Sequence, residues 1–248
     1  MQYFLETVDT IQPGLGFRQF GGYHLLWLGI LVAFCTFMAV QYRKQDTETR
    51  AKWRKRMAVA ILLDELWKMF WLMVGGNYTL GYLPLHLCSI NIILIALHAW
   101  KPNRTLDNFL YGVCIPGAMA AMLFPSWTAL PPVNFMHLHS FTVHILLIAY
   151  PVMTTVGGDI RPDWRQLPRC ILFTLCMAVP IYLFNLAFDT NFMFLMYAEE
   201  GNPLLLFEQM FGSHLVGFPV LGTVFVGAMY LILYLCRRSA RRKQEVAR

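Results

Sequence analysis

Two reactive side chains, Cys88 and His144, lie in separate apolar stretches of this 248-residue chain. A cysteine attacks a carbonyl carbon as the thiolate, so it needs a base that takes its proton, and a neutral imidazole is a suitable base. Ionisable groups are costly inside a lipid bilayer, and for this reason such residues in apolar stretches mark a functional site by default. The two residue types together indicate nucleophilic catalysis as one interpretation, and structural hydrogen bonding to a backbone carbonyl or a neighbouring helix as the other.

Helical spacing places each of these residues in a polar stripe. The stripes are Pro84, Cys88 and Asn91 in one stretch and His137, Ser140 and His144 in the other. At about 1.5 Å of rise per residue, Cys88 lies roughly 8 Å and His144 roughly 12 Å from the same membrane interface, which permits contact. His139 lies about 160° around its helix from His137, so these three histidines cannot all face one site.

A second polar group lies in the stretch LLDELWKMFW, which contains Asp64, Glu65 and Lys68. Either carboxylate can neutralise the ammonium, because the residues are three or four apart on a helix. The first interpretation is an internal ion pair that turns this helix toward the bundle interior. A proton or ion relay is the alternative.

A metal or haem site is a less favoured interpretation of the histidines, with His86, His137, His139 and His144 as ligands. The six cysteines have no metal-type spacing, and no nucleotide-binding loop, zinc motif or flavin fingerprint occurs. The sequence therefore predicts no cofactor and no metal. The structural interpretation, hydrogen bonding near the ends of the apolar stretches, applies to His24, His86, His98 and His214.

The elements that position these residues are transmembrane helices. The chain is 57% hydrophobic and 14% charged, with a mean hydropathy of +0.49, and its apolar runs reach about 18 residues or more. This composition predicts an all-α polytopic membrane protein with a bundle of about seven transmembrane helices. The predicted spans are 23–42, 57–75, 83–100, 107–125, 136–156, 169–188 and 212–236.

Lys and Arg predict the orientation of these spans. Of the 20 Lys and Arg residues, 18 lie in loops or tails on one side of a seven-span arrangement, and the exceptions are Arg18 and Lys68. By the positive-inside rule, the N-terminus is outside and the C-terminus is cytoplasmic. The predicted organisation is a short extracytoplasmic segment (1–22), one transmembrane domain (23–236) and a basic cytoplasmic tail (237–248), in the inner or plasma membrane of the cell. The basic loops are expected to meet anionic lipid and not nucleic acid.

The chain resembles the YwaF-type bacterial integral membrane proteins in three runs. These are LPLHLC at 83–88, the span from His144 into RPDW at 161–164, and NFMFL at 191–195. The resemblance covers nearly the whole chain. The family is distantly similar to the eukaryotic transmembrane protein 164 group, which is understood as a phospholipid acyltransferase with a membrane Cys and His pair. The resemblance implies Cys88 as nucleophile, His144 as base and membrane phospholipid as substrate.

Several other residues have possible roles in such a reaction. Ser89, Asn91 and Ser140 are candidate donors to the tetrahedral intermediate, and His86 or His139 are candidates for orienting His144. Asn185, Asp189 and Asn191 are expected at the end of the sixth span. They are candidates for binding a head group or lining the entrance, and helix capping is an equally good interpretation.

A non-enzymatic protein is the alternative function. Seven spans with intramembrane Asp64, Glu65 and Lys68 also suit a small-solute or proton-coupled transporter or a receptor-like sensor. A retinal protein is disfavoured, because the seventh predicted span contains no lysine for a Schiff base. The sequence gives no indication of an oligomeric state.

Overall fold

The computed structural model describes residues 3–199 and 201–246, with side chains described up to residue 239, and this part of the chain is helical without strands. This confirms the all-α prediction. Short 3₁₀ turns occur at Leu80–Tyr82, Trp164–Gln166, Phe192–Phe194 and His214–Val216. The longer elements are α1 (Gly22–Arg43), α2 (Thr47–Val74), α3 (Leu87–Trp100), α4 (Arg104–Phe109), a π-helix (Leu110–Cys114), α5 (Ile115–Leu123), α6 (Phe135–Gly157), α7 (Leu167–Phe188), α8 (Leu204–Phe211) and α9 (Gly217–Val246).

Five helical segments in the described residues are long and apolar enough to cross a membrane. They are α1, the continuous run from α4 to α5, α6, α7 with the turn before it, and α9 with the turn before it. Many large apolar side chains on α1, α7 and α9 are exposed, for example Val32, Leu172 and Leu231. Such surfaces suit lipid and not water. The chain is therefore a membrane protein.

The other two predicted spans are also helices, but they differ from the five in length or charge. α2 has 28 residues, which span about 42 Å, and it carries Asp64, Glu65 and Lys68 in its apolar part. α3 has 14 residues and spans about 21 Å, less than the hydrocarbon thickness of about 30 Å. Length and composition alone thus do not identify these two helices as spans.

The predicted start of the third span at residue 83 is wrong for the helix, which begins at Leu87. Leu83 precedes Pro84, and the residue before a proline is driven toward extended conformations. Leu83 accordingly has a ψ angle of 148°, and His86, the N-cap residue of α3, is also extended with a ψ angle of 149°. The consequence is that Cys88 lies in the first turn of α3.

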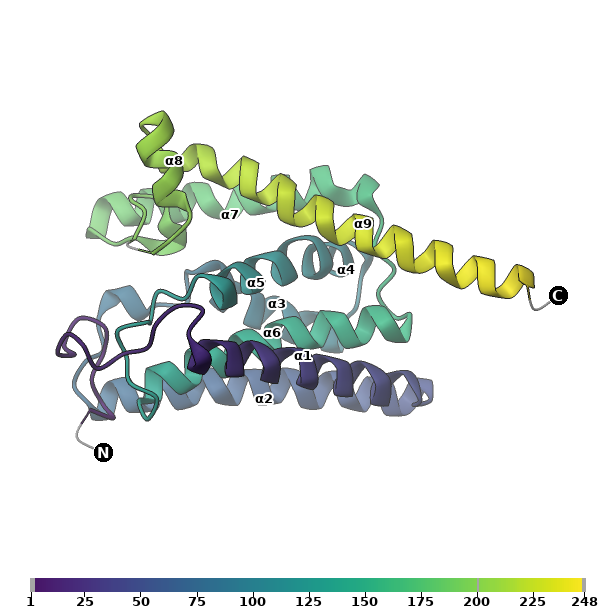
Figure 1. Ribbon diagram of the computed structural model, residues 1–248, viewed down its shortest axis with the longest axis horizontal. Coiled ribbons are helices and arrows are strands. Elements are labelled where there is room, and N and C mark those ends of the chain that lie inside the picture. The colour runs from purple at the N-terminus through teal and green to yellow at the C-terminus, as the bar shows by residue number, and fades with distance from the viewer. Residues whose placement is uncertain (1–2, 200, 247–248) are drawn as a thin grey trace.

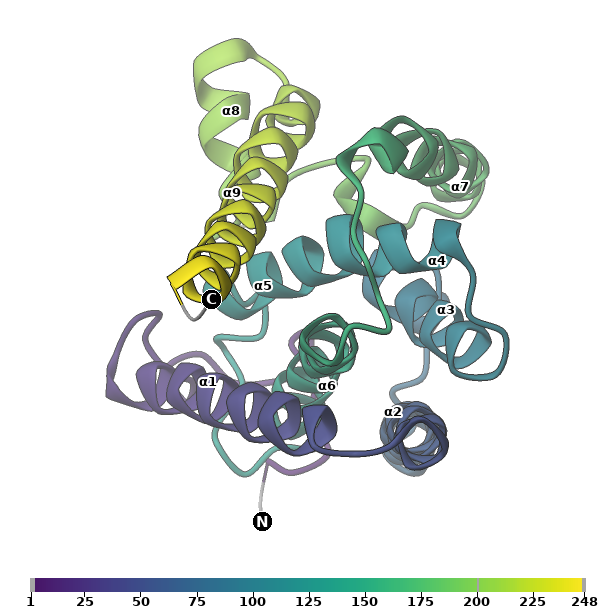
Figure 2. The same ribbon diagram turned by 90° about the vertical axis from the view of Figure 1, so that its right-hand side faces the viewer.

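Helix α6 is the centre of the fold. Fifteen of its 23 residues are buried, and it packs against α1, α2, α3 and α5. Viewed along the bundle, α6 lies among these helices, while α7, α8 and α9 lie together on one side (Figure 2). α7 contacts the rest of the bundle through α4 and the π-helix, and α9 contacts it through α5 and the π-helix. The central position of α6 explains why its polar side chains are buried.

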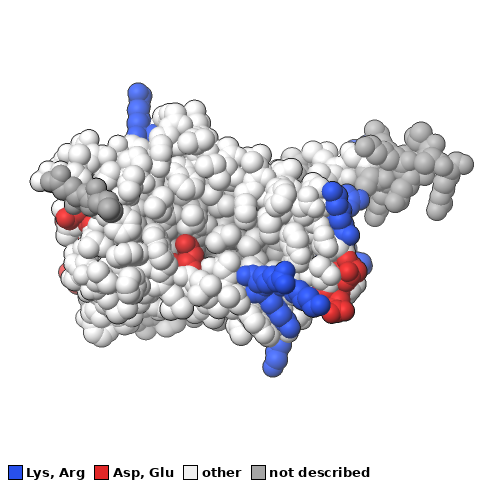
Figure 3. Space-filling model, turned by 90° about the horizontal axis from the view of Figure 1, so that it is seen from below, with Lys and Arg blue, Asp and Glu red and all other residues white. Residues whose placement is uncertain are grey.

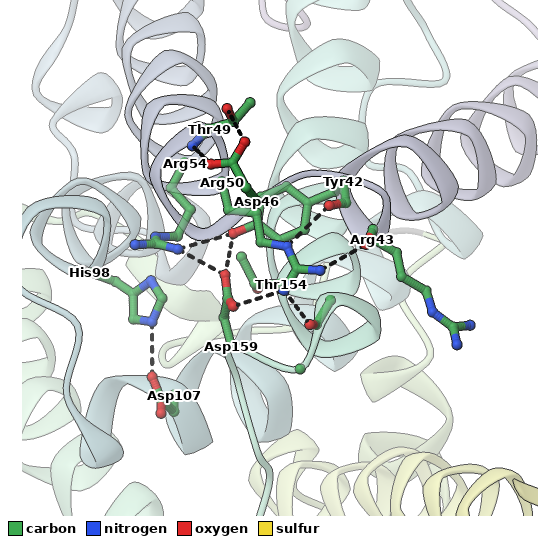
Figure 4. Close-up of polar contacts among 12 residues, drawn as sticks. Tyr42, Arg43, Asp46, Thr49, Arg50, Arg54, His98, Asp107, Thr154 and Asp159 are labelled. Atoms are coloured by element: carbon green, nitrogen blue, oxygen red, sulfur yellow. Dashed lines mark hydrogen bonds and ion pairs between the residues drawn. The ribbon is translucent and has the colours of Figure 1, made fainter.

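Polar contacts hold one end of the bundle together. At the end where α1 stops and α2 begins (Figure 1), the hydroxyl of Tyr42 donates to Asp159, and Arg54 Nη1 lies 2.8 Å from Asp159 Oδ2. Arg50 Nη1 lies 3.5 Å from Asp159 Oδ1 and donates to the carbonyl of Gly157 at 2.8 Å. These contacts join α1, α2 and the end of α6 (Figure 4). On the face shown in Figure 3, Lys and Arg gather toward this same end, here called the basic end.

The N-terminal segment closes the opposite end. The side-chain amide of Asn134 donates to the carbonyls of Tyr3 and Glu6 at 2.9 and 2.8 Å. The Phe4 ring lies against Trp71 of α2, with centroids 5.0 Å apart. Residues before α1 therefore pack over the ends of α2 and α6.

Three other features differ from the predicted arrangement. α8 lies in the predicted loop before the seventh span, and Gly212 ends it with a positive φ of 72°, so the last helix begins at Gly217. The π-helix precedes Pro116, which lacks an N–H and so cannot donate to the carbonyl four residues earlier. The predicted basic tail continues α9 as far as Val246, and residues 247–248 lie outside the described residues.

Candidate active site

Cys88 and His144 meet between α3 and α6. The Sγ atom of Cys88 lies 3.1 Å from Nε2 of His144, although the residues are 56 positions apart. His144 is 8% exposed, and Cys88 is partly buried. This is the geometry that a thiol and its base require.

The other ring nitrogen fixes the tautomer of His144. Nδ1 lies 2.5 Å from the carbonyl oxygen of Ser140, one turn earlier in α6. A carbonyl oxygen can only accept, so Nδ1 carries the proton and donates it. Nε2 of the neutral ring is then free to accept the Cys88 thiol proton. The indole of Trp127 stacks on the imidazole with centroids 5.3 Å apart and planes 12° apart, which holds the ring in this orientation.

The position of Cys88 in α3 adds donors beside its sulfur. The first N–H groups of a helix have no acceptor within the helix, and no side chain caps α3 at His86. The positive end of the helix dipole favours negative charge at this point. One turn later in α3, the side chain of Asn91 is fully buried, and neither its nitrogen nor its oxygen has a hydrogen-bond partner among the described residues.

The other predicted donors are less well placed. Ser140 is 8% exposed, and its backbone carbonyl, not its hydroxyl, has the described contact with His144. Ser89 is partly buried, and no side-chain hydrogen bond is described for it. Asn91 is therefore the strongest of the three candidates for an oxyanion donor.

His86 does not orient His144. Its Nδ1 accepts a hydrogen bond from the backbone N–H of Met193 at 3.3 Å, and its ring lies against Phe192 and Phe194. His214 Nε2 lies 3.1 Å from the carbonyl of Phe194. The contacts of His86 anchor the segment after α7 to the start of α3, next to Cys88, and the contact of His214 anchors it to the turn before α9.

The predicted head-group residues shape that same segment. Asn185 is 1% exposed; its Oδ1 accepts from Thr190 and Phe192, and its Nδ2 donates to the carbonyl of Phe192. Asn191 Oδ1 accepts from the backbone N–H groups of Met196 and Tyr197. Asp189 ends α7 in a left-handed conformation with a φ of 52°. The observed contacts thus correspond to the capping interpretation.

The charged residues of α2 form a cluster with His139 of α6. Lys68 Nζ lies 2.5 Å from Glu65 Oε1. His139 Nδ1 lies 3.1 Å from Asp64 Oδ2, and its Nε2 lies 3.6 Å from Glu65 Oε2. The expected ion pair is present, and His139 lies between the two carboxylates and not beside His144.

A comparison with protein families identifies the relationship of the chain. The model described as TMEM164 family matches residues 19–230, which is most of the sequence. The chain belongs to the TMEM164 family. This confirms the TMEM164-like part of the resemblance, and the YwaF-type assignment stays a prediction. Neither the curated proteins nor the solved structures give a match.

The histidines of this TMEM164-family protein are distributed over several sites. His137 lies against Phe17, with centroids 5.1 Å apart, and its Nδ1 is 3.2 Å from the carbonyl of Leu130. The rings of His24 and His98 bond to Met122 and to Asp107, respectively. Within the described part of the chain, no three His, Cys, Asp or Glu side chains are arranged to hold a metal ion.

Two contributors to the candidate site are missing from the sequence-based prediction. Trp127 lies in a loop outside any periodic stripe, so its stacking on His144 has no signal in helical spacing. The Ser140 carbonyl is a backbone group, which residue types do not reveal. Its position four residues before His144 was the available signal, because i and i+4 groups meet on a helix.

Proposed function

We propose that this TMEM164-family protein is an integral membrane lipid acyltransferase with Cys88 as nucleophile and His144 as general base. The observation that carries the proposal is the 3.1 Å contact between the sulfur and Nε2, together with the Ser140 carbonyl that leaves Nε2 as the acceptor. Family membership supports a membrane protein of this kind. The substrate is a membrane phospholipid, and the reaction uses no cofactor.

The first half-reaction forms an acyl-enzyme. His144 takes the proton of the Cys88 thiol as the sulfur attacks the carbonyl carbon of a lipid ester. The tetrahedral intermediate collapses by breaking the ester C–O bond, and the imidazolium returns its proton to the leaving oxygen. The products are a thioester on Cys88 and a lysolipid.

The second half-reaction returns the enzyme to its starting state. His144 removes a proton from the hydroxyl of a second lipid, and the resulting oxygen attacks the thioester carbonyl. The C–S bond breaks, the acyl group passes to the new oxygen, and the proton on His144 returns to the sulfur. Water in place of the lipid hydroxyl makes the same site a lipid acyl hydrolase.

Both tetrahedral intermediates carry an oxyanion that needs donors. The amide of Asn91, which has no partner among the described residues, lies on the same helix as the nucleophile, as do the N–H groups in the first turn of α3, where no described side chain caps the helix. Fixed donors in a site without water stabilise such charge strongly. In this proposal, the nucleophile and the oxyanion donors all belong to α3.

The proposal includes the seven-span topology with the N-terminus outside. Because the N-terminal segment packs on the end of α2, residues before α1 and residues after α2 share one side. α2 then crosses the membrane in the direction opposite to α1, and α3 returns from that side. Cys88 and His144 consequently lie in the outer half of the cell membrane, and the basic end meets anionic lipid on the inner side.

A proton-coupled transporter is the second candidate function. The cluster of Asp64, Glu65, Lys68 and His139 favours it, because chains of intramembrane carboxylates and histidines are typical of proton pathways. A transporter does not require covalent chemistry at Cys88, and the two candidates therefore differ in one measurable property.

A thioester trap tests the proposal. The purified full-length protein is incubated in nanodiscs with a phospholipid that carries an alkyne on its acyl chain, and the label on each cysteine peptide is measured. We expect label on Cys88 that neutral hydroxylamine removes, none in Cys88→Ala, and a loss of about 10²-fold or more in His144→Gln. Cys176→Ala, which changes an exposed cysteine of α7, is the matched control. Equal labelling of Cys88→Ala would exclude the nucleophile.

A further inference from the structure

The charged cluster of Asp64, Glu65, Lys68 and His139 has no role in the proposed acyl transfer. Lys68 is 7% exposed, and lysine is rarely buried to this degree unless it is paired. Its partner Glu65 lies on the same helix, so this ion pair does not by itself join α2 to another helix. A buried ion pair is also weak support for stability, since desolvation offsets much of its attraction.

The place of Lys68 in the fold points to a different role. Ile61, Lys68 and Leu72 are buried along one stripe of α2, and α2 packs against both α3 and α6. Cys88 belongs to α3 and His144 to α6. Lys68 therefore lies on the face of α2 that is buried in the bundle formed with the helices of Cys88 and His144, and its partner Glu65 contacts His139 of α6.

We infer that Lys68 is a positioning residue that supplies the positive charge stabilising the Cys88 thiolate and the oxyanion that forms next to it. The inference rests on the proposed function, which makes Cys88 the nucleophile. A charge acts strongly in a site of low dielectric constant, where water does not screen it. Neighbouring cations are a common means of activating a cysteine.

The carboxylates and His139 hold this ammonium in place. Glu65 contacts Lys68 directly, and His139 bridges from Glu65 to Asp64. Thr142 donates a hydrogen bond to Asp64 Oδ1 at 3.0 Å, so α6 holds both ends of the cluster. The signs of the charges separate two roles: the ammonium favours a thiolate, and the carboxylates oppose it.

The experiment measures the reactivity of Cys88 without any lipid substrate. The full-length protein in nanodiscs is treated with methyl methanethiosulfonate at pH 7.5, and modification of the Cys88 peptide is followed by mass spectrometry. Lys68→Met is expected to react about tenfold more slowly, which corresponds to one pKa unit of lost stabilisation. Lys68→Arg should restore most of the rate, and Glu65→Gln should react at least as fast as the wild type.

The control is Lys52→Met, which breaks an exposed ion pair with Glu48 elsewhere on α2 and should leave the rate unchanged. If Lys68→Met does not fold, the double variant Glu65→Gln/Lys68→Met takes its place, because it leaves neither member of the pair buried alone. Wild-type reactivity in the folded variant without Lys68 overturns the inference. An equal slowing in Glu65→Gln and Lys68→Met also overturns it, since that result indicates a purely structural cluster.

The thioester trap separates this inference from the proposed function. Normal acyl-enzyme formation in Lys68→Met, with unchanged thiol reactivity, removes the role of Lys68 and leaves the acyltransferase intact. Slow thiol reactivity in Lys68→Met, without any acyl-enzyme in the wild type, removes the acyltransferase and leaves the charge effect at Cys88.

Discussion

Asn91 lies one turn after the nucleophile Cys88 in α3, and its burial lowers the stability of the protein. Both polar atoms of its side chain are buried without a partner in the described structure, and each such group costs about 1–3 kcal/mol. Leu has nearly the same shape and no polar atoms. If Asn91 serves the reaction, the protein retains it despite this cost.

The variant Asn91→Leu is therefore expected to raise the thermal unfolding midpoint and to lower the rate of acyl-enzyme formation. The rate loss should be about 10²-fold, the usual effect of removing one oxyanion donor. Differential scanning fluorimetry and the thioester trap measure the two effects on the same preparation. A stabilised variant with wild-type acylation would show that Asn91 is not the donor.

For single residues, the sequence pattern predicts the helix face on which a side chain lies better than it predicts the residue that this side chain contacts. Predicted depth and helix face indicate that Cys88 and His144 can meet and that His139 lies on another side of α6. The structure shows both features. They do not reveal that His139 meets Asp64 and Glu65, because that contact depends on the rotation of α2. The partners of His86 lie more than 100 residues away, beyond any periodic pattern.

Asn134 controls the start of the central helix. Its Oδ1 accepts from the backbone N–H of His137 and caps α6, while its Nδ2 holds Tyr3 and Glu6 of the N-terminal segment. Asn134→Ala is expected to destabilise the protein by about 1–3 kcal/mol, through loss of the cap and of the donors to these carbonyls. Denaturation of the purified protein in detergent measures the change.

Asn134→Asp separates the two roles. Aspartate is as good a helix cap as asparagine, but it has no donor for the two carbonyls and places a charge against them. We expect it to be at least as destabilising as Asn134→Ala. Wild-type stability in Asn134→Asp would mean that the contacts to the N-terminal segment contribute nothing.

Asp46 makes the start of α2 sensitive to pH. The backbone N–H and the hydroxyl of Thr49 donate to its carboxylate, and the backbone bond is the main cause that lowers the pKa of Asp46 below its usual value. A carboxylate whose pKa is lower in the folded than in the unfolded state stabilises the fold at pH values above its unfolded-state pKa of about 3.9. This stabilisation is lost as the pH falls through the folded-state pKa. Asp46→Ala should thus lower the unfolding midpoint at pH 7, and its difference from the wild type should shrink toward pH 3. A difference independent of pH would contradict the charged cap.

At the level of elements, hydropathy locates helices and misses their irregular ends. Each of the seven predicted stretches contains a helix or a helical run, because apolar composition over about 18 residues is a strong signal. α8 was not predicted, since its eight residues are too few to span a membrane. Pro84 disfavours a helical conformation at Leu83, a local signal that the hydropathy window averages out, and α3 begins only at Leu87.

Over the whole molecule, the end of α2 decides between two topologies. If α2 and α3 both cross the membrane, the turn at residues 76–82 lies outside, with the N-terminal segment. If neither crosses, that turn remains on the same side as the loop between α1 and α2. The contact of Phe4 with Trp71 and the hydrogen bond from Asn77 to the carbonyl of Leu5 favour the first arrangement. α2 is also about 42 Å long, which is more than a crossing requires.

Labelling with a membrane-impermeant maleimide on intact cells distinguishes these topologies. Thr79 is exposed in the turn after α2, and Lys44 is exposed between α1 and α2. We expect Thr79→Cys to be labelled without permeabilisation and Lys44→Cys only after it, with the wild-type chain as the control for the native cysteines. Labelling of Lys44→Cys but not of Thr79→Cys on intact cells would show that the orientation is inverted. Protection of both cysteines from the reagent on intact cells would show that α2 and α3 do not cross the membrane. In that last case α3 would not enter from the outer surface, and the active site could not draw its lipid from the outer half of the bilayer.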